Sequence, residues 1–151
     1  MHEIALDTER YGRLIDFLRR FYDVILLDLG TGLVSPLALF ALERADQGLI
    51  VTTPDWITSS KVLGALPDLH RWLGDKHLGL VINKIPSGPG ADTTAIEQHF
   101  RHHQLGRHVA IPYNEQLLTM LDTGTYTLEG LPRSVRVPIK RLGLTLAEQL
   151  V

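Results

Sequence analysis

Four short apolar runs divide the chain, and each is too short and too continuous to be an amphipathic helix. They lie near residues 23–28, 48–53, 78–83 and 108–111. A strand that is apolar at every position is typical of a parallel sheet covered on both faces, because neither face meets water. Between the runs, apolar residues recur at helical spacing, as in Leu63, Leu66 and Leu69. The alternation predicts one α/β domain over residues 1–151, in which helices flank a parallel sheet of about four strands.

Capping residues and prolines mark where several of the helices are predicted to begin. Asp7 is a candidate N-cap for a first helix, and Ser35 followed by Pro36 starts a second, nearly all-apolar one. Pro138 is predicted to open a last helix over residues 138–150, whose apolar residues recur on one face.

Composition narrows the setting in which such a domain works. The 151 residues contain no cysteine, so nothing indicates an oxidising compartment. A formal net charge of −2, from 15 Lys and Arg against 17 Asp and Glu, provides no overall attraction to nucleic acid. No apolar stretch approaches the about 20 residues of a membrane span, and the N-terminus lacks the pattern of a secretory signal. We expect a cytoplasmic protein, with attachment to the periphery of a membrane left open.

The turn after the first apolar run is the first candidate site. Asp28 lies at the carboxyl end of that predicted strand and is followed by Leu29-Gly30-Thr31-Gly32. Ligands bind at the carboxyl ends of strands in open α/β sheets, where glycines allow close approach of the backbone and a carboxylate can hold a metal ion or a water. The alternative is a structural turn in which Asp28 only caps neighbouring backbone.

Four motifs together resemble a known family in their order and spacing. They are Tyr22-Asp23-Val24-Ile25-Leu26-Leu27-Asp28 with Gly32, Thr52-Thr53-Pro54-Asp55 with Ser59-Ser60, Val81-Ile82-Asn83-Lys84, and Ile111-Pro112-Tyr113-Asn114-Glu115. From about Phe17 to its end, the chain resembles the C-terminal two-thirds of a MinD/ParA-type ATPase. The resemblance implies a P-loop NTPase fold that lacks the N-terminal P-loop strand. Members of this family dimerise on binding ATP and separate on hydrolysis, and so position cellular machinery.

The resemblance also implies roles for individual residues. Asp28 matches the Walker B acid that supports Mg²⁺ indirectly, and Gly32 matches the switch glycine that senses the γ-phosphate. The base-side residues are Asn83, a strand-end amide that contacts the base, and Pro112, Tyr113, Asn114 and Glu115, the loop that closes over it. The alternative for Asn83 is an amide that only bonds neighbouring backbone.

The sequence departs from the family because it has no glycine-rich phosphate-binding loop with its lysine. Gly88-Pro89-Gly90 is no substitute, since no lysine follows it and proline lacks the amide donor that a phosphate needs. ATP and Mg²⁺ are therefore expected as cofactors only if the phosphate-binding half is supplied elsewhere, and the chain alone is not expected to hydrolyse ATP. It is either the C-terminal part of a longer ATPase or a shortened relative that keeps the scaffold.

The missing strand also bears on partners, because in the family it lies between the strands that match residues 23–28 and 48–53. Either these two strands pair directly, or a second copy or a P-loop-containing partner chain fills the space between them. We expect a component of an ATP-switched positioning or assembly system, acting as a homodimer or with a protein of a positioning or secretion machinery. The alternatives are a non-enzymatic interaction scaffold and an adaptor that contacts DNA or lipid.

Two side-chain clusters remain. His99, His102 and His103 have a helical spacing that can gather imidazoles for a metal, but no acid or cysteine joins them in a known motif, so a solvated face is the favoured interpretation. Four basic residues are the candidates for contact with a membrane or DNA. The favoured interpretation is that they are solvated charges beside a helix whose apolar face packs on the core. They are Arg133, Arg136, Lys140 and Arg141.

Overall fold

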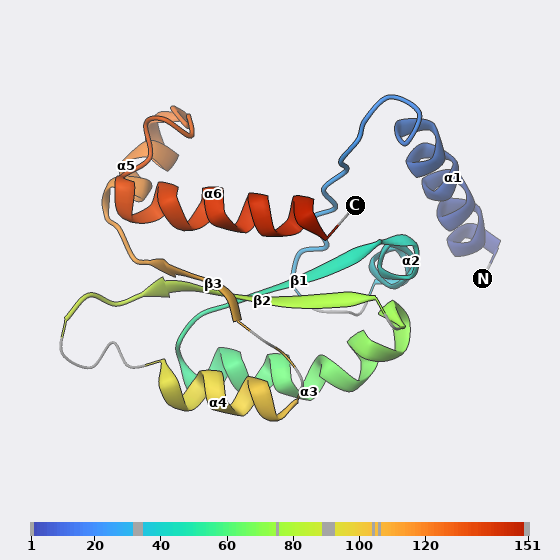
Figure 1. Ribbon diagram of the computed structural model, residues 1–151. Coiled ribbons are helices and arrows are strands. Elements are labelled where there is room, and N and C mark those ends of the chain that lie inside the picture. Colours follow the sequence, from blue (N-terminus) through green and yellow to red (C-terminus); the bar gives the residue numbers. More distant parts are fainter. Residues whose placement is uncertain are drawn as a thin grey trace.

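A three-stranded parallel sheet with helices on both faces forms the centre of the described chain (Figure 1). The computed structural model describes residues 2–31, 35–74, 76–88, 93–103, 105 and 107–149. In chain order the elements are α1 (His2–Leu18), α2 (Pro36–Arg44), β1 (Gln47–Thr52), α3 (Trp56–Leu73), β2 (His77–Ile85), α4 (Thr94–His102), β3 (Arg107–Pro112), α5 (Gln116–Thr123) and α6 (Arg133–Glu148). None of these helices is long and apolar enough to cross a lipid bilayer.

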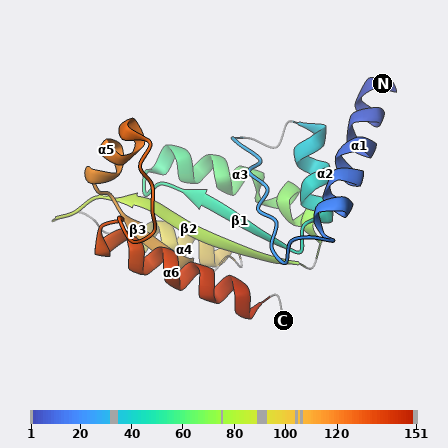
Figure 2. The same cartoon turned by 90° about the horizontal axis from the view of Figure 1, so that it is seen from above.

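The strands lie in the order β1-β2-β3, so β2 is central and is paired on both sides. Its residues from Leu78 to Ile82 are all buried, as predicted for a strand covered on both faces. Helices α3 and α4 lie on one face of the sheet and α6 on the other, as two perpendicular views agree (Figures 1 and 2). The prediction of an α/β domain with a parallel sheet is confirmed at this level.

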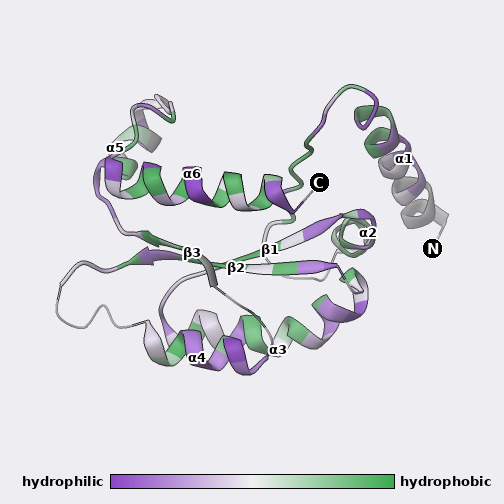
Figure 3. Ribbon diagram, viewed as in Figure 1, coloured by the Kyte–Doolittle hydropathy of each residue, from purple (hydrophilic) through white to green (hydrophobic). Residues whose placement is uncertain are grey.

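The core fills the space between β2 and the α3–α4 layer. Phe100, Leu80 and Ile82 are completely buried there, and Leu66 and Leu73 of α3 are 1% exposed. Apolar and polar residues alternate along the helices, as expected of amphipathic helices packed on a sheet (Figure 3). Apolar burial between these layers is the main stabilising contribution.

The prediction of a strand at residues 23–28 is wrong. These residues form an irregular segment between α1 and α2, and residues 23–31 make no backbone hydrogen bond to the backbone of any residue that the structure describes. Val24 is 59% exposed and Leu26 is 84% exposed. The described sheet therefore has three strands rather than about four, and the direct pairing with the strand at 48–53 is not formed. The apolar run matches a buried strand in composition, but a strand also needs a paired edge and a covering layer.

The other predicted strands are confirmed, with ends shifted by one or two residues. Two helix starts differ more: α1 begins at His2 rather than near Asp7, and α6 begins at Arg133 rather than at Pro138. Pro138 lies inside α6, where it removes one backbone donor without ending the helix. The basic residues of this region thus lie on the helix itself.

Ionic and aromatic contacts hold α1 against α2 beside the start of β1. Arg19 donates to the carbonyl oxygen of Arg44 at 3.0 Å and lies 3.3 Å from the Asp46 carboxylate. Arg44 pairs with Asp16, and the rings of Tyr11 and Phe40 lie 6.4 Å apart. Exposed ion pairs contribute little to stability, so the buried side chain of Ile15 is the stronger contribution of α1 to the fold.

Candidate functional site

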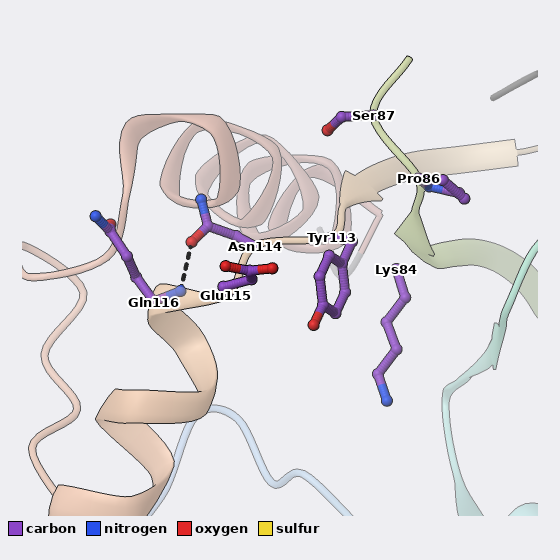
Figure 4. A pocket seen from close by; sticks show the side chains of 7 residues that line it. All are labelled: Lys84, Pro86, Ser87, Tyr113, Asn114, Glu115 and Gln116. Carbon is purple, nitrogen blue, oxygen red and sulfur yellow. Dashed lines mark hydrogen bonds between the residues drawn. The ribbon is translucent and has the colours of Figure 1, made fainter. Parts of the chain in front are cut away.

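An open pocket of about 680 Å³ lies where β2 and β3 end (Figure 4). Its described lining comes from two segments, the turn after β2 and the loop that leads from β3 into α5. The lining residues are Lys84, Pro86, Ser87, Tyr113, Asn114, Glu115 and Gln116. Ligands bind at this edge of a parallel sheet because the connecting loops converge there.

An irregularity near the end of β2 aims Lys84 at the pocket. The pairing of β2 with β3 shifts register between Ile82 and Ile85. Between them Lys84 has a φ of 58°, a left-handed conformation that non-glycine residues seldom adopt. The Asn83 side-chain oxygen accepts a hydrogen bond from the Lys84 backbone N–H at 2.9 Å and supports this turn. Bulges of this kind redirect side chains at the ends of strands.

Two hydrogen bonds fix the opposite wall of the pocket. The Tyr113 N–H donates to the carbonyl oxygen of Ile85 at 2.8 Å and so joins the two segments. The side-chain oxygen of Asn114 accepts from the Gln116 N–H at 2.9 Å, which satisfies a free donor at the start of α5. Tyr113 is 43% exposed, and its side chain extends in the same direction as that of Lys84 (Figure 4).

The chemistry of the pocket suits a flat, polar ligand. The Tyr113 ring offers a face for stacking, Lys84 a positive charge, and Glu115 a carboxylate that accepts hydrogen bonds. All three side chains are exposed, so binding to them displaces water rather than core contacts.

The structure brings together most of the residues predicted for the base side, but not all of them. Tyr113, Asn114 and Glu115 line the pocket, and Pro112 ends β3 directly before them. Asn83 is not among the lining residues, and its side-chain oxygen bonds neighbouring backbone, which is the alternative stated for it. Sequence reasoning did not include Lys84, Pro86, Ser87 and Gln116. Lys84 could have been predicted as a pocket residue from its position directly after Asn83 in the motif.

The Asp28 turn has the geometry of the structural alternative. An Asp28 carboxylate oxygen accepts a hydrogen bond from the Gly30 N–H at 2.9 Å, and Gly30 has a φ of 67°. This is an Asx-type turn that satisfies the chain locally. Gly32 lies outside the described residues. Among the residues that are described, no group of three or more His, Cys, Asp or Glu side chains could hold a metal ion.

The Thr52 to Asp55 motif has a structural use at the start of α3. One Asp55 oxygen accepts from the Thr58 N–H at 2.8 Å as the N-cap, and the other accepts from the Thr53 hydroxyl. The bond from Thr53, together with that from Thr58, lowers the pKa of Asp55 from 3.8 to about 2. The carboxylate is therefore bonded more strongly in the folded state than in the unfolded one.

Asp55→Ala is expected to lower the thermal unfolding midpoint above pH 4, because it removes the cap of the longest helix. The folded pKa lies below the unfolded one, so this contribution is complete above about 4 and is lost as the pH falls through about 2. Melting curves of the variant and the parent should converge at low pH. Asp68→Ala, an exposed carboxylate on the same helix, is the control, and an equal effect of both variants would contradict the capping role.

Three of the four predicted basic residues lie on the outside of α6. Arg133, Lys140 and Arg141 are exposed, whereas Arg136 is partly buried and donates to the Glu129 carbonyl oxygen at 2.9 Å. Val135, which lies between Arg133 and Arg136 in the sequence, is 1% exposed, so another face of α6 packs inward. The arrangement is that of a solvated rim beside a packed helix.

No protein-family model matches the chain, and no curated protein matches it significantly.

Proposed function

We propose that this chain is the base-side part of a MinD/ParA-like nucleotide-binding domain and works as a component of an ATP-switched positioning or assembly system. One observation carries the proposal. Tyr113, Asn114 and Glu115, which the sequence resemblance assigns to the base side, line one pocket at the carboxyl edge of the sheet together with Lys84, the residue that follows the assigned Asn83. This convergence depends on the fold and does not follow from either motif alone.

In this proposal the base stacks on Tyr113 and its polar edge meets the loop at Asn114 and Glu115. Lys84 stands at the opposite side, where its ammonium group can donate hydrogen bonds to the base or the sugar. Phosphate groups need several backbone donors and cations around them, and the sequence contains no glycine-rich loop with a lysine. Binding energy should therefore come from the base and the sugar. ATP hydrolysis would require phosphate-binding groups from another segment or chain.

Calorimetric titration of adenosine, ADP and Mg-ATP into the chain tests this proposal. We expect all three to bind weakly and with similar affinity, with Kd values of about 0.1–1 mM, since the phosphates add little. Tyr113→Ala should weaken each of them about tenfold or more, because stacking on an aromatic side chain contributes about 1–3 kcal/mol per base.

Tyr22→Ala is the matched control, because Tyr22 is also exposed but does not line the pocket. It should leave all three affinities unchanged. Mg-ATP binding about 100-fold tighter than adenosine would show phosphate donors that the proposal does not include. A base site at Tyr113 would be contradicted if Tyr113→Ala left the affinities unchanged, or if none of the three ligands bound.

A second candidate function is a protein-interaction scaffold that uses the free edge of β1. Within the described residues β1 pairs with β2 alone, and its Gln47–Thr52 sequence has none of the charges or prolines that protect natural sheet edges. Leu49 is 37% exposed and Val51 is 61% exposed. Under this hypothesis light scattering gives a dimer or larger species, and Val51→Lys returns it to the mass of one chain. A single-chain mass for the parent protein would contradict it.

A further inference from the structure

A row of three aromatic rings crosses from the start of α3 to the end of α4, and none of the three residues is among those that line the pocket. The rings of Trp56 and His99 meet edge to face, with their centroids 5.4 Å apart. His99 and His103 follow at a centroid distance of 6.0 Å. Trp56 is 60% exposed, and both histidines are also exposed, so metal ions in solution can reach them.

The two histidines have the spacing and the position of a chelating pair. Residues four apart on a helix are neighbours on its surface, so both imidazoles can turn toward one point. With metal–nitrogen bonds of about 2 Å, two imidazoles on one ion hold their ring centres about 5 Å apart, which is a small rotation from the observed distance. His103 is the C-cap of α4, and the negative end of the helix dipole favours a cation there.

The neighbouring charges do not oppose a cation at this place. Arg101 lies 3.7 Å from the Glu97 carboxylate, which offsets its charge. His102 is exposed and directly precedes His103 in the sequence. No third His, Cys, Asp or Glu ligand joins the pair among the residues that the structure describes, so water would complete the coordination.

We propose that His99 and His103 together bind a divalent late transition-metal ion beside Trp56. Imidazole nitrogen suits Cu²⁺, Ni²⁺ and Zn²⁺, and at a site with two nitrogens the affinity is highest for Cu²⁺. The ion lies at the end of α4, and Trp56 against His99 restricts the orientation of that ring. This site is independent of the proposed nucleotide pocket.

Quenching of Trp56 fluorescence by Cu²⁺ measures this binding directly. The experiment uses untagged protein with Trp72→Phe, so that Trp56 is the sole indole reporter. We expect saturable quenching with one ion per chain, reversed by a chelator. His103→Ala should raise the Cu²⁺ concentration at half-saturation about tenfold or more, because one imidazole loses the chelate effect of two.

His102→Ala is the matched control, since His102 is exposed on the same turn but is not part of the ring row. It should change the half-saturation point less than twofold. Circular dichroism of each variant checks that α4 remains helical. Equal effects of His102→Ala and His103→Ala, or quenching that rises linearly without saturation, would overturn the site.

Discussion

Leu80→Ala is expected to lower the unfolding free energy by about 2–5 kcal/mol, whereas Leu26→Ala should change it by less than about 0.5 kcal/mol. The two leucines lie in apolar runs that look alike in the sequence. Leu80 is completely buried in the central strand β2, and its truncation leaves a cavity among α3 and α4 side chains. Leu26 is 84% exposed in the segment between α1 and α2, so little apolar surface is lost. Urea unfolding followed by circular dichroism measures both values.

The comparison of these two variants tests the correction to the predicted sheet. A Leu26→Ala cost close to that of Leu80→Ala would mean that residues 23–28 form a buried strand in solution. The slope of unfolding free energy against urea concentration reports the surface exposed on unfolding. A slope that changes in one variant alone would indicate a change in that surface, so the midpoint and the slope are both needed.

Phe100→Ala should have the largest effect of any change in α4, about 3–5 kcal/mol of unfolding free energy. Its ring is completely buried in the core cluster with Leu66 and Leu105, and it is the main apolar anchor of a nine-residue helix. Ile57→Ala is the control, because Ile57 is equally apolar but 69% exposed. We expect it to change the unfolding free energy by less than about 0.5 kcal/mol.

Chemical denaturation of both variants gives these values, and amide hydrogen exchange shows where the fold opens. Protection should fall first over α4 in the Phe100→Ala protein. A small loss of stability without a local loss of protection would contradict the anchoring of α4 by this ring.

The central strand β2 could be predicted because its middle satisfies one physical condition at every position. From Leu78 to Ile82 every residue is apolar, and every one is buried between two layers. The run from Val24 to Leu27 meets the same local condition but has no paired edge beside it among the described residues. An apolar run shows that a segment is compatible with a buried strand. Whether it becomes one depends on whether the rest of the chain provides a paired edge and covering helices.

The candidate site divides in a similar way. The loop from Tyr113 to Glu115 could be located because a motif and the strand end coincide there. The aim of Lys84 could not, since its left-handed φ of 58° depends on a register shift against β3. Asp28 shows the converse, because an acid and a glycine in a ligand-like pattern can form a local turn that needs no ligand.

The most direct test of the proposed base site is a map of amide chemical-shift changes on titrating adenosine into isotope-labelled protein. The account predicts saturable changes at Lys84, Ser87 and the loop from Tyr113 to Gln116, with the same residues responding to Mg-ATP. Changes centred on Asp28 to Thr31, or changes that appear only with Mg-ATP, would contradict it.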